Sequence, residues 1–305
     1  MAHEVRSDLD ALQRGRASVT PAEGMKLYTT GFEGVSLRNF YRGRSAFLLC
    51  SGPSLAEHDL SQLHRRGILT MGVNNAWAVF RPDLWLCVDH PGRFLDVGWK
   101  DPGVLKFAPL ANRDTRLRVQ RAGGSIAHSA FRVRDMPSVL LYLRTERFDH
   151  KRWARLDQMT GLNWGCHNDT TDSLGIKGKR SCMLAAIHLL YYLGVRRLAL
   201  VGADFRMDPA RPYAFDERRN AASVRHNTAL YRALDQRLAA LRPELERAGM
   251  VITNCTPGSG LTAFEYEPFD EAVERAGREC AKPFTTAGWY TDLPEPAARA
   301  GAVAR

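Results

Sequence analysis

The sequence has no apolar run close to the roughly 20 residues that a membrane-spanning helix needs, so we expect no contact with a membrane. Its first 16 residues are polar and charged and lack the apolar middle of a signal peptide. None of its 6 cysteines forms a Cys-x-x-Cys pair, which argues against a structural zinc site. Several of them lie inside apolar runs, as reduced core thiols do. We therefore expect a cytoplasmic protein that holds no metal.

Motifs that mark several common enzyme families are also absent. The sequence contains no P-loop, no His-Glu-x-x-His zinc motif, no Gly-x-Ser-x-Gly elbow and no Gly-x-Gly-x-x-Gly fingerprint. Its 305 residues, 45% of them hydrophobic, are nevertheless enough for a large globular core. Any ligand site must therefore be recognised from the arrangement of the predicted strands.

Short apolar runs that end in polar residues, glycine or proline predict a parallel sheet. Such runs occur at residues 46–50, 68–73, 84–88, 198–201 and 250–253. Residues 181–193 are apolar almost all round and predict a buried helix that ends at Gly194. Residues 220–248 predict a long helix with a break near Pro243, and Ser54 is expected to cap a helix that runs to Leu63. The pattern indicates one α/β domain with a mostly parallel central sheet, helices on both faces and a lid segment.

The composition divides the chain into three parts. We expect an N-terminal extension over residues 1–40, a folded domain over residues 41–285 and a flexible tail over residues 286–305, which is rich in alanine, proline and arginine. Inside the domain, residues 111–179 resemble a basic insertion. Residues 206–225 contain several arginines and no clear apolar period, which predicts a lid.

The net charge of +10 is concentrated in the basic insertion. Residues 111–155 contain eleven Lys and Arg residues against four acidic residues, which gives +7. Such an excess favours a polyanionic partner such as nucleic acid, because binding releases counterions; the alternative is a solvated, arginine-rich surface. The candidate contacts to a nucleic acid or another acceptor are Arg113, Arg116, Arg118, Arg132 and Arg134.

The polar residues that follow the strands are candidate ligand contacts, because ligands of open parallel sheets lie beyond the carboxyl ends of the strands. A glycine there lets the backbone approach a ligand, and a helix N-terminus offers N–H groups to phosphate. The alternative for the Ser-Gly-Pro-Ser turn, the asparagine and the aspartate after β-strand runs is that they only form or cap turns. The candidate nucleotide contacts are Ser51, Gly52, Pro53, Ser54, Asn74, Asp89, Gly202 and Phe205. Asp204 is a candidate catalytic residue, because a carboxylate at the end of a buried strand is well placed for a ribose hydroxyl, a metal or an acceptor hydroxyl.

The lid and the helix after it add a second group of candidates. Arg206 and Tyr213 lie in the lid, where they can contact a leaving phosphate or an acceptor. His226 lies near the start of the next helix, and its imidazole is suited to act as a general base, although a surface histidine without a role is the alternative.

In this order and spacing, the motifs resemble those of a group of Rossmann-like transferases. The similarity covers residues 41–270 and includes the 6-hydroxymethylpterin diphosphokinase-like proteins and the bacterial sialyltransferases that use CMP-sialic acid without a metal. It implies a Rossmann-like (GT-A-like), nucleotide-binding catalytic domain. The residues that carry it are 43–47, 51–55, Asn74, Asp89, 201–205, His226 and 254–259.

The resemblance to the sialyltransferases assigns a role to each matching position. It implies that Gly52, Ser54 and Asn74 hold the nucleotide and that His226 is the general base. The remaining donor-site residues would be Ser181, Gly202, Asp204 and Phe205. Two positions depart from the sialyltransferase pattern: Ser51 stands where that group has asparagine, and Arg206 stands where it has a tyrosine that assists departure of the phosphate. An arginine can also stabilise a leaving phosphate.

Three functions follow as hypotheses. The first is a glycosyltransferase with a nucleotide-sugar donor and an acceptor hydroxyl on a modified nucleic-acid base, as in phage-type DNA modification. The second is a diphosphokinase that transfers pyrophosphate from ATP to a small hydroxymethyl compound, with Mg²⁺ beside Asp89 and Asp204. The third is a nucleic-acid-binding module without catalysis. No feature of the sequence predicts an oligomeric state.

Overall fold

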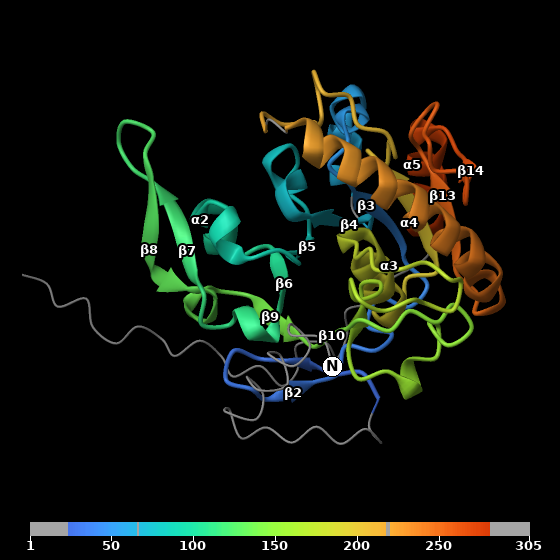
Figure 1. Cartoon of the computed structure of the whole chain (residues 1–305), viewed down its shortest axis with the longest axis horizontal. Helices are drawn as coiled ribbons and strands as arrows, with labels where there is room; N and C mark the ends of the chain where they lie inside the picture. Colours follow the sequence, from blue (N-terminus) through green and yellow to red (C-terminus); the bar gives the residue numbers. More distant parts are fainter. Residues whose placement is uncertain (1–23, 66, 218–219, 281–305) are drawn as a thin grey trace, which may run out of the picture.

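The computed structural model describes residues 24–65, 67–217 and 220–280, and a ten-stranded sheet forms its centre (Figure 1). The strand order is β14-β13-β12-β3-β4-β5-β6-β9-β1-β2. Every neighbouring pair from β14 to β9 is parallel, and only β1 is antiparallel, to both β9 and β2. The predicted mostly parallel α/β sheet is therefore confirmed. The strands are β1 (Leu27–Tyr28), β2 (Gly34–Val35), β3 (Ser45–Leu49), β4 (Leu69–Val73), β5 (Leu84–Leu86), β6 (Leu105–Pro109), β9 (Val139–Tyr142), β12 (Arg197–Val201), β13 (Val251–Asn254) and β14 (Glu265–Tyr266).

The chain changes direction across the sheet between β3 and β12. It starts at β3, adds β4, β5, β6 and β9 on one side, and then returns to place β12, β13 and β14 on the other side. Parallel sheets of this kind leave a crevice beyond the carboxyl ends of the two strands at the reversal. The residues that follow β3 and β12 therefore lie where a ligand site is expected.

Alternating side chains of the central strands pack against helices on both faces of the sheet. Ala46 and Leu48 belong to the apolar cluster that contains α3 (Cys182–Tyr192) and residues of α4 (Ala221–Arg247). Phe47 and Leu49 belong to the cluster that contains residues of α5 (Phe269–Cys280). This period of two confirms that helices cover both faces.

The two long helices begin where the sequence predicts. Ser181 caps α3 by accepting a hydrogen bond from the Met183 N–H at 3.1 Å, and Asn220 caps α4 by accepting one from the Ser223 N–H at 2.8 Å. The predicted break near Pro243 is wrong, because α4 runs through it as one helix of 27 residues. Buried leucines on both sides of the proline hold the helix on the sheet.

None of the helices in the described part of the chain has the length and the apolar composition that crossing a membrane requires.

The helix predicted from Ser54 to Leu63 is also wrong. The segment forms two short 3-10 helices, η2 (Pro53–Glu57) and η3 (Leu60–His64). The Asp59 side chain accepts a hydrogen bond from the Ser61 N–H at 3.2 Å, which caps η3 and separates the two turns. Ser54 caps neither turn, since Gly52 occupies the N-cap position of η2 and the Ser54 hydroxyl bonds elsewhere.

The expected extension and insertion both contribute to the main sheet. β1, from the expected extension, pairs with β9, which comes from the expected basic insertion and lies parallel beside β6. The boundaries at residues 40 and 111 therefore do not separate these segments from the domain. Residues 1–23 and the expected tail at 286–305 lie outside the described residues.

The basic segment also forms an antiparallel ribbon, β7 (Arg116–Gln120) and β8 (Ile126–Arg132), that projects from the rest of the fold (Figure 1). Its base contacts η5 (Pro91–Arg93) and α2 (Asp96–Lys100). Two further short strands, β10 (Arg144–Thr145) and β11 (Leu162–Asn163), pair in parallel next to α3.

Two glycines at helix ends allow a matched test of this fold. Gly194 follows α3 with φ of 96°, and an added Cβ would lie 2.7 Å from Asn39 Cα and 2.9 Å from Arg42 N. Gly249 follows α4 with φ of 82°, and nothing lies within 4 Å of its position. We expect Gly194→Ala to lower the free energy of unfolding by about 2–5 kcal/mol, because the left-handed backbone and the overpacking both act against alanine. Gly249→Ala should cost only about 1–2 kcal/mol, the backbone part alone. Urea denaturation measures both, and equal losses would contradict the packing of α3.

Candidate active site

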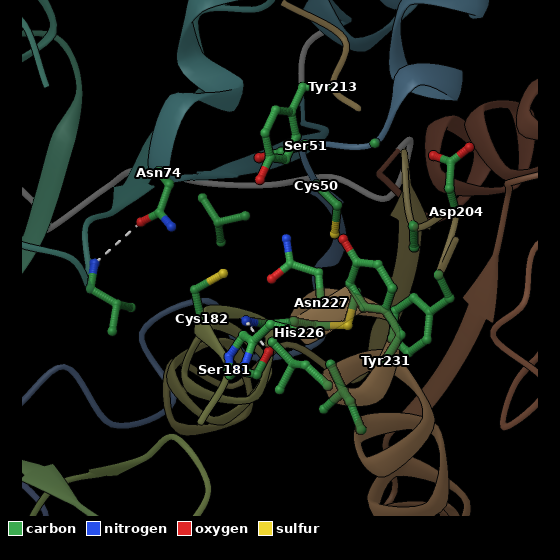
Figure 2. Close-up of a pocket in the computed structure, with 18 of the residues that line it drawn as sticks. Cys50, Ser51, Asn74, Ser181, Cys182, Asp204, Tyr213, His226, Asn227 and Tyr231 are labelled. Atoms are coloured by element: carbon green, nitrogen blue, oxygen red, sulfur yellow. Dashed lines mark hydrogen bonds between the residues drawn. The ribbon is translucent and has the colours of Figure 1, made fainter. Parts of the chain in front are cut away.

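A pocket of about 680 Å³ opens at the crevice between β3 and β12 (Figure 2). Of the candidate ligand contacts, Ser51, Gly52, Asn74, Asp89, Ser181, Gly202, Asp204 and Phe205 all line it. Arg206 and Tyr213 from the expected lid, and His226 from α4, line the same pocket. The structure thus brings together the residues predicted at the strand ends and the histidine predicted to lie over them.

The turns after β3 and β12 are packed directly on each other. The Gly52 N–H donates to the Gly202 carbonyl at 2.9 Å, and the Cys50 N–H donates to the Val201 carbonyl at 2.8 Å. A Cβ on Gly52 would collide with the Asp204 carboxylate and would lie 2.5 Å from the Gly202 carbonyl. Gly202 itself has φ of 72°. Only glycine fits between the two turns, because any side chain would force them apart.

The Asp204 carboxylate is part of this packing. It is only 4% exposed, and its Oδ2 accepts a hydrogen bond from the Ser54 hydroxyl at 2.8 Å. Figure 2 shows the carboxylate pointing away from His226, at the edge of the pocket. Ser54 and Pro53 line a second, smaller pocket on that side, with Asp204 and Arg206 shared between the two. This geometry favours a role for Asp204 in shaping the turn.

Two residues of the pocket have a left-handed backbone although neither is glycine. Asn74, after β4, has φ of 47°, and Phe205, after β12, has φ of 52°. Asparagine tolerates this conformation, but for phenylalanine it is strained, and such strain persists only where the surroundings impose it. The Phe205 ring stacks on Tyr231 with ring centroids 5.3 Å apart. Burial and the nearby Tyr213 raise the pKa of Tyr231 and keep its phenol neutral.

Asp89, which follows the carboxyl end of β5, contributes a carboxylate to the pocket. Asn74 donates to Asp89 at 3.4 Å and accepts a hydrogen bond from the Val88 N–H at 3.4 Å. Asp89 also forms an ion pair with Arg93 at 3.2 Å. Asp89 and Asp204 thus have different partners, and no group of three metal-binding side chains occurs among the described residues.

The N-terminus of α3 forms another wall of the pocket and gives it a positive potential. Ser181 and Cys182 lie at the first turn of the helix, where the helix dipole favours anions. Arg180 lies beside them, with its guanidinium 3.1 Å from Glu146 and 4.8 Å from the centroid of the Trp164 ring. Burial and the negative charge of Asp89 raise the pKa of Cys182 to about 12, so this thiol stays protonated at neutral pH.

Several lining residues were not predicted as site residues. Asn227 and Tyr231 follow His226 on α4, and the lining positions 223, 226, 227, 230, 231 and 234 repeat with the period of one helix face. Given His226 as a site residue, this helical spacing could have identified Asn227 and Tyr231 from the sequence. Arg180 directly precedes a predicted residue, whereas Trp164 lies in an irregular loop without any periodic signal.

The predicted acceptor arginines do not line the pocket. Arg113 donates to the Thr30 carbonyl at 2.6 Å, and the side chains of Arg132 and Arg134 both bond to Asp114. Arg118 donates to the Arg93 carbonyl, which ties the base of the β7–β8 ribbon to the pocket edge.

The comparisons with known proteins give a loose likeness to one type of fold. No protein-family model and no curated protein matches the chain. Among solved structures, the sialyltransferase CstII from Campylobacter jejuni in complex with CMP-3FNeuAc is 13% identical, with a TM-score of 0.39 over 74% of this chain and 86% of that chain. The sialyltransferase CST-II in complex with a trisaccharide acceptor and CMP is 14% identical, with a TM-score of 0.35 over 73% of this chain and 85% of that chain.

The contact between the two strand-end turns leads to a prediction about Gly52. Its φ of −68° suits any residue, so Gly52→Ala acts only through the collision with Asp204 and the Gly202 carbonyl. We expect the variant to lower the free energy of unfolding by about 1–3 kcal/mol, as overpacking does. Gly277→Ala in α5 is the control, because nothing lies within 4 Å of the added Cβ there. Thermal denaturation should show a loss only for Gly52→Ala, and an unchanged melting temperature would mean that the turns are not in contact.

Proposed function

We propose that the chain is a glycosyltransferase that uses a nucleotide sugar as donor. The observation that carries this proposal is the pocket at the reversal of the sheet, where the turns after β3 and β12 face the exposed His226. Its volume of about 680 Å³ lies in the range of sites for small organic ligands. A nucleotide fits its chemistry, because phosphate is favoured at the α3 N-terminus and Asn74 offers an amide to a ribose or a base.

His226 is the proposed general base. Its imidazole takes the proton from an acceptor hydroxyl while the oxygen attacks the anomeric carbon of the donor. The bond from that carbon to the phosphate oxygen breaks, and the nucleotide leaves with the bonding electron pair. Arg206 is exposed, with one hydrogen bond to the Gly258 carbonyl at 3.3 Å, and its guanidinium stabilises the departing phosphate.

The proposed lid is the described part of the predicted segment 206–225 that precedes α4, residues 206–217, because residues 221–225 belong to that helix. The Ala214 N–H donates to the Ser51 carbonyl at 3.1 Å, and Asn75 donates to Glu217 at 3.0 Å. Tyr213 lies beside Ser51 at the pocket (Figure 2). A closed segment of this kind excludes water, which protects a reactive donor from hydrolysis.

The proposed acceptor is a hydroxyl on a nucleic-acid base. Support comes from the β7–β8 ribbon, which projects from the body and carries Arg116, Arg118, Arg121 and Arg132. The Arg116 side chain is exposed and has no polar partner in the described part of the chain. Because the ribbon is tied to Arg93 at the pocket edge, a polyanion held on it would lie next to the pocket, and a flipped-out base could enter.

We expect His226→Ala to slow sugar transfer by about 10²–10⁴-fold, because the hydroxyl loses its base. Nucleotide binding should be kept, since the α3 N-terminus and the strand-end turns are unchanged. The measurements are turnover and isothermal titration, after a thermal-shift screen of CMP-, UDP- and GDP-sugars, ATP and S-adenosylmethionine has identified the donor. Arg225→Ala is the matched control, because Arg225 is exposed on the same turn but does not line the pocket. Full activity of His226→Ala would remove the proposed base.

The turnover and thermal-shift assays, together with a DNA-binding assay, separate this function from a diphosphokinase and from a nucleic-acid-binding module. A diphosphokinase would be stabilised by ATP with Mg²⁺ and would turn over no sugar nucleotide. A nucleic-acid-binding module would bind DNA and show no turnover of either kind.

We expect the double substitution Arg116→Ala, Arg121→Ala to weaken binding of a single-stranded DNA oligonucleotide. The slope of log K against log salt should become shallower by about 1–2, because the variant contacts fewer phosphates and its binding therefore releases fewer counterions. Arg278→Ala on α5 is the control, because that side chain is 72% exposed and belongs to another part of the surface. Unchanged affinity and slope would rule out the ribbon as a nucleic-acid contact.

A further inference from the structure

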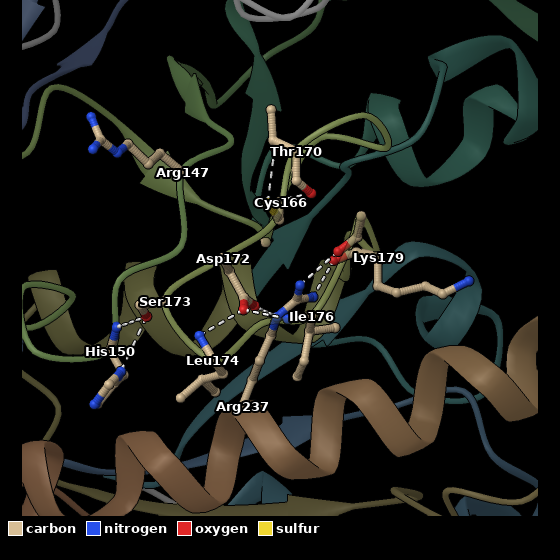
Figure 3. Close-up of polar contacts among 12 residues, drawn as sticks. Arg147, His150, Cys166, Thr170, Asp172, Ser173, Leu174, Ile176, Lys179 and Arg237 are labelled. Atoms are coloured by element: carbon tan, nitrogen blue, oxygen red, sulfur yellow. Dashed lines mark hydrogen bonds and ion pairs between the residues drawn. The ribbon is translucent and has the colours of Figure 1, made fainter.

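An ion pair between Arg237 and Asp172 is completely buried next to the pocket walls (Figure 3). The side chains are 1% and 0% exposed, and the Arg237 Nε lies 2.7 Å from Asp172 Oδ2. Buried charges of this kind add little net stability, because their desolvation offsets their attraction. Stability alone therefore does not account for the pair.

Both partners of the pair are fully engaged with the same loop. Arg237 also donates to the carbonyls of Gly178, at 2.6 Å, and Lys179. Asp172 Oδ1 accepts hydrogen bonds from the N–H groups of Leu174 and Ile176, both at 2.9 Å. One guanidinium thus holds a carboxylate and two carbonyls, a fork geometry that only arginine provides.

The pair joins two walls of the pocket. Arg237 belongs to α4, the helix that carries His226, and lies eleven residues or about 16 Å further along it. Asp172 and Lys179 belong to the loop between β11 and α3, and the next residues of that loop, Arg180 and Ser181, line the pocket. Fixing this loop on α4 therefore fixes the α3 N-terminus relative to His226.

We propose that Arg237 and Asp172 are positioning residues that set the α3 N-terminus against α4. The proposal rests on the proposed function in one respect, that the pocket between these walls binds the donor. Without the pair, the loop loses the carboxylate at its centre and its contacts with α4. Arg180 and Ser181 then no longer face His226 in one geometry, and the donor phosphates are no longer held at a fixed distance from the base.

Three cysteines report on this positioning without any assay of transfer. Cys166 lies in the loop, where its thiol contacts Thr170 at 3.0 Å, and Cys182 lies at the start of α3 in the pocket. Cys255 follows β13 and is buried outside the loop, so its thiol becomes accessible only when the domain opens. The rate at which a thiol reagent modifies each cysteine, read by peptide mass spectrometry, measures opening of the loop and of the domain separately.

Arg237→Lys and Asp172→Asn are the test variants, since the first keeps the positive charge but removes the fork, and the second keeps the shape of the side chain but removes its charge. We expect each to raise the modification rates of Cys166 and Cys182 by about tenfold or more, with Cys255 unchanged, because only the loop opens. Nucleotide affinity should fall in both variants. Arg242→Lys is the matched control on α4, because Arg242 pairs with Glu246 and Glu265 on the outside of the helix.

Two results would overturn the proposal. Equal increases for all three cysteines would show that the pair acts on the stability of the whole domain. Unchanged rates in both variants would show that the loop is held by other contacts. If the rates of Cys166 and Cys182 rise selectively while the unsubstituted protein binds no nucleotide, the proposed function fails and the positioning of the loop stands.

Discussion

The close contact between the turns after β3 and β12 is the constraint on which the rest of the site depends. These strands meet at the reversal of the sheet, and Gly52 and Gly202 let their backbones touch. The buried Asp204 carboxylate then completes the contact through the Ser54 hydroxyl. Because the turns are fixed in this way, Arg206, Tyr213 and α4 can line a pocket over them.

Charge is distributed over the pocket in a way that suits a phosphorylated ligand. The α3 N-terminus and Arg206 supply positive potential, while Arg180 is paired with Glu146 and Asp89 with Arg93. The Asp204 carboxylate is bonded to the Ser54 hydroxyl and points away from His226 (Figure 2). The imidazole of His226 is exposed and lies on a different helix from the anion-binding wall. In the proposed function, this geometry separates the groups that would bind the donor from the group that would activate the acceptor.

The sequence was informative where burial imposes a period and uninformative where contacts between distant segments decide the structure. The apolar runs predicted the core strands, and the residues after them proved to share one pocket. Residues 53–64 became two 3-10 turns because the Asp59 side chain competes for the backbone. The partnership of β1 with β9 and the Arg237–Asp172 pair join segments far apart in the chain, and no local pattern marks them.

Hydrogen exchange with and without the best nucleotide from the thermal-shift screen tests the central claim most directly. If the crevice at the sheet reversal holds the donor, the bound nucleotide should slow exchange in three peptides together: those after β3 and β12 and the one that enters α3. The β7–β8 ribbon should exchange at the same rate in both samples. Protection confined to other regions, or no nucleotide that slows exchange at all, would contradict the account.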